Sequence, residues 1–274
     1  MFEGIINKKK DGGVMHSLTI IEPRKMAGYS VAKANEFIWN SMYSLSLMEQ
    51  RIIACAISML DSRAEAEIDS MWVEIDADAF CELFNISKRS SVSYIMRLLK
   101  PLSDKSSWIK LDNGHIKLFR WISDIDVDPH SKIFRIEIGR DLKQYLLNLD
   151  KNFTSYKLEM ITSFQSKYSN IIFDLIYSHW RREGFSVGGG KRKYPAGEFQ
   201  ILLEDLKDKI LYKWVREGKE LVMKRFDLSF KDFRVKVIEP AISEINQFTD
   251  MSVSVNYIKK GKKYEIIQFS YAPK

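Results

Sequence analysis

One stretch near the C-terminal end constrains the fold most, because it combines a basic amphipathic helix with two strands that follow directly. Residues 229–250 read SFKDFRVKVIEPAISEINQFTD. Ser229 and Asp232 have the spacing of a helix start, where the hydroxyl accepts a backbone N–H bond. Apolar residues then recur at helical spacing and predict one buried face. Pro240 has no N–H to donate, so we expect a kink in the turn before it.

The residues after this helix predict a two-stranded hairpin with a basic tip. Residues 252–257 and 264–271 have the composition of strands. Four lysines surround Gly261 between them, namely Lys259, Lys260, Lys262 and Lys263. A helix followed by such a hairpin is the arrangement of a winged helix-turn-helix, in which the hairpin is the wing.

Three cations lie in the first two turns of the predicted helix: Lys231, Arg234 and Lys236. Guanidinium and ammonium groups at the start of a groove-facing helix can contact guanine edges and phosphates. A surface helix with solvated lysines explains the same residues. In that alternative Arg234 pairs with an acid such as Glu239 or Asp227.

The charge is distributed unevenly between the two halves of the chain. Residues 151–274 contain 23 Lys and Arg against 15 Asp and Glu, a net charge of +8, whereas residues 1–150 contain 20 against 21. The basic half therefore favours a polyanionic partner, and nucleic acid before a membrane surface because no amphipathic lipid-binding helix accompanies the charge. A solvated basic surface remains the alternative.

The first half contains a second helix-turn-helix pattern. After a helix at 47–60 with a capping box at Ser46 and Glu49, a strand is predicted at 72–75 and a helix at 77–84, and the next helix at 88–99. The last of these helices places polar side chains opposite its apolar stripe, and we predict DNA contacts from Arg89, Ser90, Ser93, Tyr94 and Arg97. An ordinary exposed face could carry the same residues.

The rest of the first half predicts a wing and a dimerisation surface. Strands at 108–111 and 116–122 flank an Asp-Asn-Gly turn and are predicted to be the wing, followed by a strand at 133–138 and a short helix at 140–149. We predict that this half mediates dimer formation, because it is near-neutral and we expect Met42, Leu45 and Met59 to be exposed.

The second half repeats the plan of the first. Helices are predicted at 163–182 and 199–211, separated by a glycine-rich loop with a basic end at Lys191, Arg192 and Lys193, and a basic linker leads to Phe226. The predicted fold is therefore α+β, two tandem winged helix-turn-helix domains. The predicted divisions are a flexible tail at 1–28, a first domain at 29–150 and a second at 151–274.

Composition and motifs exclude several classes. No apolar run is long enough for a membrane span, and no secretion signal is present. Two cysteines without CxxC spacing fit a reducing cytoplasm. The four histidines are scattered without an H-x-H pair, so a metal-dependent rolling-circle nuclease and a zinc site both lack their ligands. We predict no enzyme activity and no cofactor.

Four blocks of this sequence resemble the iteron-binding replication initiators of theta-replicating plasmids, the Rep/Pi group. They are SLMEQRIIACAIS, SFQSKYSNIIFDLIYSHW, FKDFRVKVIEPAISEIN and VSVNYIKKGKKYEIIQFSY, and they span residues 35–271. The resemblance implies two winged-helix domains that bind repeated sites in double-stranded DNA at a plasmid origin. It also implies opening of an AT-rich region and recruitment of the host initiator and helicase. Dimers in equilibrium with monomers would repress the protein's own promoter.

Carried onto this sequence, the resemblance places the second recognition helix from Lys231 onward, with Arg234 and Lys236 in the major groove, and its counterpart at 88–100. Two other classes remain open. One is a double winged-helix transcriptional repressor without a replication role, and the other is a module whose winged helices bind protein. The basic wing argues against the second of these.

Overall fold

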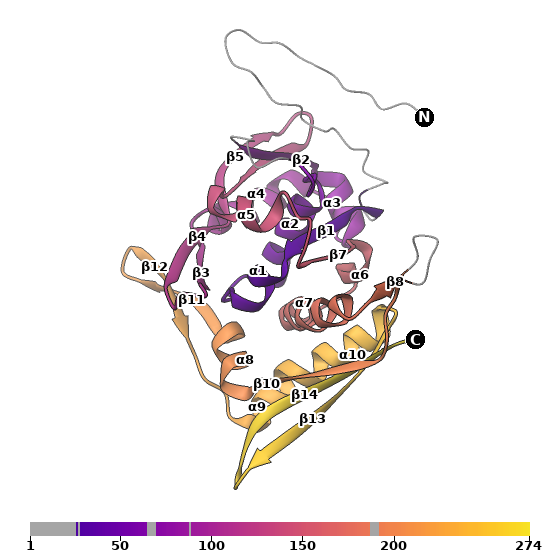
Figure 1. Cartoon of the computed structure of the whole chain (residues 1–274). Helices are drawn as coiled ribbons and strands as arrows, with labels where there is room; N and C mark the ends of the chain where they lie inside the picture. Colours follow the sequence, from indigo (N-terminus) through magenta and orange to yellow (C-terminus); the bar gives the residue numbers. More distant parts are fainter. Residues whose placement is uncertain (1–25, 27, 65–69, 88, 187–191) are drawn as a thin grey trace.

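The computed structural model describes residue 26 and residues 28–64, 70–87, 89–186 and 192–274. Its first half contains a helix–strand–helix–helix–strand–strand unit (Figure 1). In chain order the elements are α2 (Leu47–Ser58), β2 (Met71–Asp76), α3 (Ala77–Leu83), α4 (Ser91–Ser103), β5 (Ile122–Asp128) and β6 (Ile133–Ile138). The three strands form an antiparallel sheet in the order β2-β6-β5, so β5 and β6 are the wing.

The second half repeats this order of elements. It contains α7 (Lys167–Arg182), β10 (Gly197–Leu202), α8 (Leu203–Ile210), α9 (Phe230–Phe233), η3 (Arg234–Ile238), α10 (Glu239–Phe248), β13 (Met251–Lys260) and β14 (Lys263–Pro273). Its sheet has the order β10-β14-β13, the same position for each strand as in the first unit. The predicted fold of two tandem winged helices is therefore confirmed.

Local signals explain where the helices begin. The capping box at Ser46 is present, since the Glu49 N–H donates to the Ser46 hydroxyl and the Glu49 carboxylate accepts from the Ser46 N–H. Asp76 caps α3 by accepting the Ala79 N–H at 2.7 Å. Helix α7 begins after Ser166 rather than at 163, because the Ser166 hydroxyl accepts the Tyr168 N–H.

Additional elements join the two halves. β1 (Ser30–Ala34) pairs antiparallel with β7 (Phe153–Lys157), and α1 (Asn35–Asn40) and α6 (Glu159–Thr162) lie beside them. The predicted helix at 140–149 is shorter, consisting of η2 (Arg140–Leu142) and α5 (Lys143–Leu146). The division after residue 150 stays a prediction about separately folding units, and the β1–β7 pairing crosses it.

Besides the β1–β7 pair, three more strand pairs of the described chain lie outside the two three-stranded sheets, and the last of them in chain order lies between residues 212 and 225. β3 (Ser106–Lys110) and β4 (Ile116–Arg120) form the hairpin that we predicted as the first wing, but it is a separate two-stranded sheet inserted before β5. That prediction was wrong because the chain starts a new strand at Ile122, whose side chain is buried with the β6 residues. In another of these pairs, β8 (Phe185–Ser186) lies antiparallel to β9 (Arg192–Lys193).

The segment from 197 to 225 also differs from its prediction. Residues 197–202 are strand β10 and not helix, because pairing with β14 lets the Phe199 ring stack on Phe269 at 5.3 Å between centroids. The expected basic linker is a regular hairpin of β11 (Tyr212–Glu217) and β12 (Glu220–Arg225). Its turn is made at Gly218, which has a φ of +62°.

Buried polar contacts connect the second winged helix to the segment between α1 and α2. The Lys209 ammonium on α8 donates to the Ser41 carbonyl at 2.9 Å, and the Tyr43 N–H donates to the Lys209 carbonyl at 2.8 Å. Complete burial lowers the pKa of Lys209 to about 7, and the nearby Asp174 opposes that shift. The Trp214 indole donates to Ser44 at 3.0 Å.

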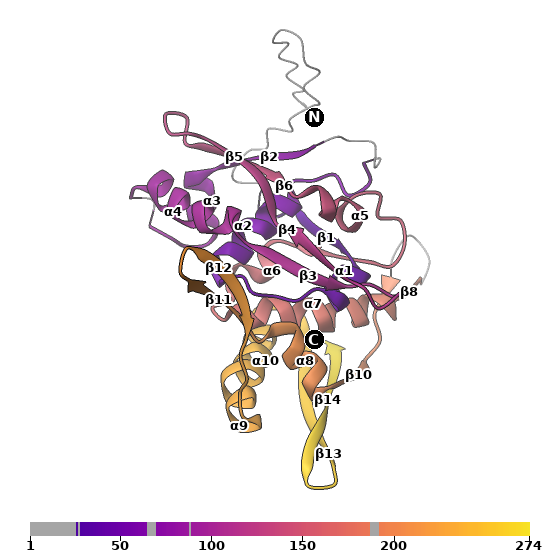
Figure 2. The ribbon, with the colours of Figure 1, turned by 90° about the vertical axis from the view of Figure 1, so that its left-hand side faces the viewer.

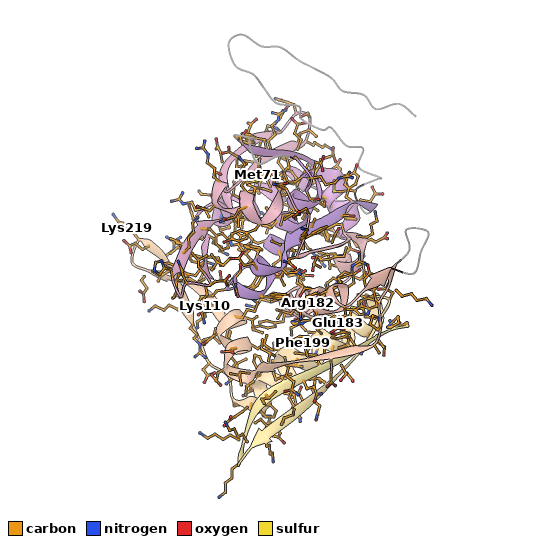
Figure 3. The ribbon with its side chains drawn as sticks, in the orientation of Figure 1. Met71, Lys110, Arg182, Glu183, Phe199 and Lys219 are labelled. Atoms are coloured by element: carbon orange, nitrogen blue, oxygen red, sulfur yellow. The ribbon has the colours of Figure 1, made fainter. Side chains whose placement is uncertain are left out.

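Aromatic stacking adds to this junction. The His179 ring on α7 stacks on Phe199 at 3.9 Å between centroids and on Trp39 at 5.4 Å. Figure 3 labels Phe199, a residue of β10, on the side of the second sheet that contacts α7. Burial first, and the Arg182 charge second, lower the pKa of His179 to about 4.

Two further findings concern membrane helices and cysteines. Within the part of the chain that the structure describes, no helix is long and apolar enough to cross a membrane. Cys55 and Cys81 are both buried free thiols.

Candidate nucleic-acid interface

The helix formed by α9, η3 and α10 has one buried and one exposed face. Phe233, Val237, Ile238, Ala241, Ile242 and Ile245 are buried, as the apolar periodicity predicts. Lys231, Val235 and Lys236 are exposed on the other side, and Arg234 lies half-exposed at the edge. The Ser229 hydroxyl caps the helix by accepting the Asp232 N–H at 3.1 Å. The helix therefore presents a basic outer face within its first two turns.

The π-helical segment η3 lies in the turns immediately before Pro240, where we predicted a kink. A π turn places residues five apart on nearly the same side, whereas an α-helix separates them by about 140°. Arg234 and Glu239 are such a pair, and the Arg234 Nε lies 3.1 Å from a Glu239 carboxylate oxygen. The ion pair named above as the alternative to base contact is therefore present in the DNA-free chain.

This pair leaves part of Arg234 accessible. The arginine and glutamate side chains keep 42% and 52% of their surface exposed. Lys236 pairs with Asp232 at 2.7 Å one turn away, and this contact, followed by the Ser229 hydroxyl, lowers the pKa of Asp232. Both cations are thus held in position by carboxylates on the helix itself, while their outer surfaces face solvent.

The second wing packs directly against the start of this helix. The Phe230 ring stacks on Tyr264 at 4.1 Å and meets Tyr257 edge-on at 5.2 Å. The Lys259 ammonium lies 4.8 Å from the centre of the Tyr264 ring. Gly261, with a φ of +67°, makes the tight turn of the hairpin. These contacts fix the position of the wing relative to the helix.

The lysines of the wing tip are all exposed: Lys259, Lys260, Lys262 and Lys263. Among the described residues, only Lys260 approaches a carboxylate, 4.0 Å from Glu265. The tip therefore concentrates positive charge on a projecting hairpin, as the sequence predicts.

In the first half, the predicted site residues occupy the start and outer face of α4. Arg89 and Ser90 precede the helix, which begins at Ser91 and not at 88, because Ser90 has a left-handed φ of +61°. Ser93 and Arg97 are exposed on the helix, as is Met96 with 47% of its surface. Tyr94 was expected on the open face, but its half-buried ring packs against the core.

The first wing differs from the second in its charge. Its strand β5 carries Asp124, Asp126 and Asp128, and its turn contains His130. Asp126 pairs with Arg135 at 2.8 Å, and the Asp128 carboxylate accepts bonds from the turn residues His130 and Ser131. An acidic wing is repelled by phosphates, so the cations of α4 carry the candidate DNA surface of this half.

The third predicted basic segment is only partly described. Lys191 lies outside the described residues, and Arg192 is described only as part of strand β9. Lys193 is exposed, opposite Phe185 in the β8–β9 pair. The contribution of these three cations to DNA binding stays a prediction.

The elements that carry the candidate surfaces of the two halves lie on the same side of the molecule. In Figure 2, α4, the β11–β12 hairpin and the α9–α10 helix follow one another down one side of the molecule. The sequence does not predict two features of this side. Val235 is 44% exposed beside Lys236, in a position suited to a thymine methyl group. The second feature is the β11–β12 hairpin, where the sequence predicts a basic linker.

Comparisons with known proteins agree with this architecture. A family model described as "Initiator Replication protein, WH1" matches residues 30–177, and one described as "Initiator Rep protein, WH2" matches residues 198–271. A "Replication initiation protein" from Escherichia coli is 21% identical over 248 residues, which cover 89% of this chain and 70% of that protein.

A solved structure shows the same fold. The crystal structure of Pi initiator protein in complex with iteron DNA matches with a TM-score of 0.67 at 20% identity, and the match covers 90% of this chain and 98% of that one. The two family models together account for most of the sequence, one for each winged helix. The chain therefore belongs to the initiator replication protein family.

Proposed function

We propose that this protein is a plasmid replication initiator that binds repeated origin sites, or iterons, in double-stranded DNA. The observation that carries the proposal is that α4 and the α9–α10 helix, which both carry exposed cations, lie on one side of the molecule (Figure 2). The Pi initiator, which has the same fold, was solved with iteron DNA bound.

The proposed binding mode uses both halves on one DNA site. Helices α4 and α9–α10 enter successive major grooves about 10 base pairs apart, and the site spans about 20 base pairs. The junction at Lys209 and Ser41 limits independent movement of the halves. Arg234 reads guanine edges, while the wing lysines follow the phosphate backbone.

The wing lysines and α4 cations supply the salt-dependent part of the affinity. Each phosphate that a lysine or arginine neutralises releases counterions, which lowers the affinity as salt rises. The contacts from Arg89, Ser90, Ser93 and Arg97 belong to this proposal, as does a contact from the half-buried Tyr94.

Dimer formation in the first half is also part of the proposal, with a corrected surface. Met42 and Leu45 are buried, with 9% and 2% of their surface exposed, so they are not the dimer contacts that we predicted. Trp108, Ile116 and Leu118 are instead exposed and lie on one face of the β3–β4 hairpin, whereas the exposed Met96 lies on α4. A dimer through this face would bind an inverted repeat in the gene's own promoter and repress it.

The remaining steps follow from binding at repeated sites. Several copies on adjacent iterons would bend and open a neighbouring AT-rich segment, where the host initiator and helicase enter. These steps distinguish an initiator from a double winged-helix repressor, which would bind one operator and do nothing further.

The test supplies the protein in trans. A plasmid that carries the replicon's origin but no initiator gene is introduced into cells that express this chain from a second, unrelated plasmid. An initiator maintains the origin plasmid, and an Arg234→Ala variant expressed at the same level does not. A chain that represses a promoter fusion but never maintains the origin plasmid is a repressor, and the proposal then fails.

A further inference from the structure

We propose that the β11–β12 hairpin is a third DNA-contacting element, whose tip binds phosphates between the two major grooves read by the helices. The proposal rests on the proposed function, because it places the hairpin on the DNA that the two winged helices share.

The hairpin has a shape that packing alone does not explain. It is an insertion between α8 and α9, where a helix-turn-helix needs only a short turn. Six residue pairs form its ladder, so it reaches about 20 Å from its base. Its side chains, including Trp214, Val222 and Met223, are exposed or only partly buried. A two-stranded hairpin of this kind is marginally stable by itself and needs anchors.

Those anchors lie at the base of the hairpin. The Trp214 indole donates to Ser44 in the first half, and the Arg225 guanidinium lies 2.6 Å from the Asp208 carboxylate on α8. Lys224, also near the base, pairs with Glu217 of the other strand. These contacts set the direction in which the tip projects and neutralise two of the hairpin's cations.

Of the three cations that these pairs leave free, Arg216 and Lys219 lie near the tip and Lys213 lies at the base. Residues 212–225 contain five Lys and Arg against two Asp and Glu. Arg216 and Lys219 are exposed, and neither forms an ion pair within the described part of the chain. Figure 3 shows Lys219 at the tip, pointing away from the body of the molecule. Both cations are therefore available to an external anion.

The position of the hairpin indicates which anion these two cations bind. In Figure 2 it lies below α4 and above α9–α10, on the side that presents both helices. When those helices occupy successive major grooves, the stretch of duplex between them faces the hairpin. The phosphates of the two DNA strands border that stretch. Cations on a hairpin in this position contact the phosphates without reading the base sequence.

The experiment compares the full-length chain with two double variants of equal charge change. The tip variant is Arg216→Gln with Lys219→Gln. The control is Arg140→Gln with Lys143→Gln, on η2 and α5, which lie on the opposite side of the molecule (Figure 2). Each protein is titrated at several salt concentrations against a duplex that the parent chain selects from a random-sequence pool and against a scrambled duplex.

The tip variant is expected to bind both duplexes on the order of tenfold more weakly, with a salt slope lower by about two, one phosphate for each lost cation. Hydroxyl-radical protection should fall between the two major-groove patches and stay unchanged within them. The control should match the parent.

A tip variant whose salt slope and central protection match those of the parent overturns the proposal. So does a loss confined to the selected duplex, which would make Arg216 or Lys219 a base contact. If the parent selects no sequence from the pool, the proposed function fails, yet the salt slope on scrambled DNA still tests the hairpin. Near-equal thermal unfolding of all three proteins excludes a folding defect.

Discussion

Replacing Arg234 with alanine separates a base contact from a surface ion pair. In the free chain the Arg234 Nε lies 3.1 Å from Glu239, with both side chains about half exposed. Exposed pairs of this kind contribute at most about 1 kcal/mol to stability. Arg234→Ala should therefore lower the free energy of unfolding by less than about 1 kcal/mol.

The effect on DNA binding should be larger and specific to sequence. A guanidinium that binds both acceptors of a guanine contributes about 1–3 kcal/mol, so affinity for the selected duplex should fall about 5- to 150-fold. On a scrambled duplex the loss should be only that of one cation. Lys236→Ala, two residues further along the same helix, is the matched control and should weaken both duplexes to a similar extent.

Fluorescence anisotropy at several salt concentrations measures both quantities, and thermal unfolding measures the stability. Glu239→Gln adds an independent arm, because it removes the carboxylate that holds Arg234 and an acid that repels phosphate. It should bind both duplexes more tightly but discriminate between them less. Equal losses on both duplexes for Arg234→Ala, or unfolding destabilised by more than about 2 kcal/mol, would refute the base-contact role.

Three further predictions address the wing, the junction and the dimer. Lys262→Gln at the wing tip should weaken selected and scrambled duplexes alike and lower the salt slope by about one; a loss confined to the selected duplex contradicts this. His179 has a pKa of about 4 in the folded chain, against 6.5 for an unperturbed histidine. Between these two pH values the unfolded chain binds more protons than the folded chain, so the free energy of unfolding should decline as pH falls from about 6.5 to about 4. Urea unfolding should show a decline on the order of 2 kcal/mol, after discounting for the partly exposed ring. The decline should disappear in His179→Phe, and an equal decline in that variant would assign the effect to another group. Leu118→Lys on the β3–β4 face should shift sedimentation of the full chain toward monomer, while an unchanged profile removes this face from the dimer.

Much of the fold follows from local signals in the sequence. The capping residues Ser46, Asp76 and Ser229 and the apolar periodicity behind them place the main helices, because both signals act within one or two helical turns. The kink before Pro240 stays a prediction. The structure has a π-helical segment there, which joins Arg234 to Glu239 and which the sequence does not reveal.

The predictions that were wrong concern segments whose structure depends on pairing with distant parts of the chain. Residues 197–202 carry a pattern compatible with a helix, and only their ladder with β14, some 70 residues away, makes them a strand. Choosing between two hairpins for the first wing likewise requires knowing which strand pairs with β2. The exposure of Met42 and Leu45 was predicted wrongly because their burial depends on tertiary contacts: the Met42 N–H donates to Trp108, and Leu45 lines a cavity shared by residues of both halves, such as Ile53 and Ile171.

The candidate site likewise combines residues that the sequence predicts with features that it does not predict. Exposed cations in the wing and on α9–α10 were found directly, because charge clusters are visible in sequence. The β11–β12 hairpin was missed because its significance lies in its position between two helices that are more than 100 residues apart. The half-buried Tyr94 ring shows that a helical wheel alone misplaces residues at the boundary of a face.

The most direct test of the central claim is a hydroxyl-radical footprint of the full chain on its replicon's origin. Two winged helices on one side of the molecule predict, at each repeated site, two protected patches about one helical turn apart, on one face of about 20 base pairs. Alanine variants connect each patch to a helix, since Arg97→Ala should weaken protection in one patch and Arg234→Ala in the other. A single patch no longer than one half-site, or loss of the same patch in both variants, would contradict the account.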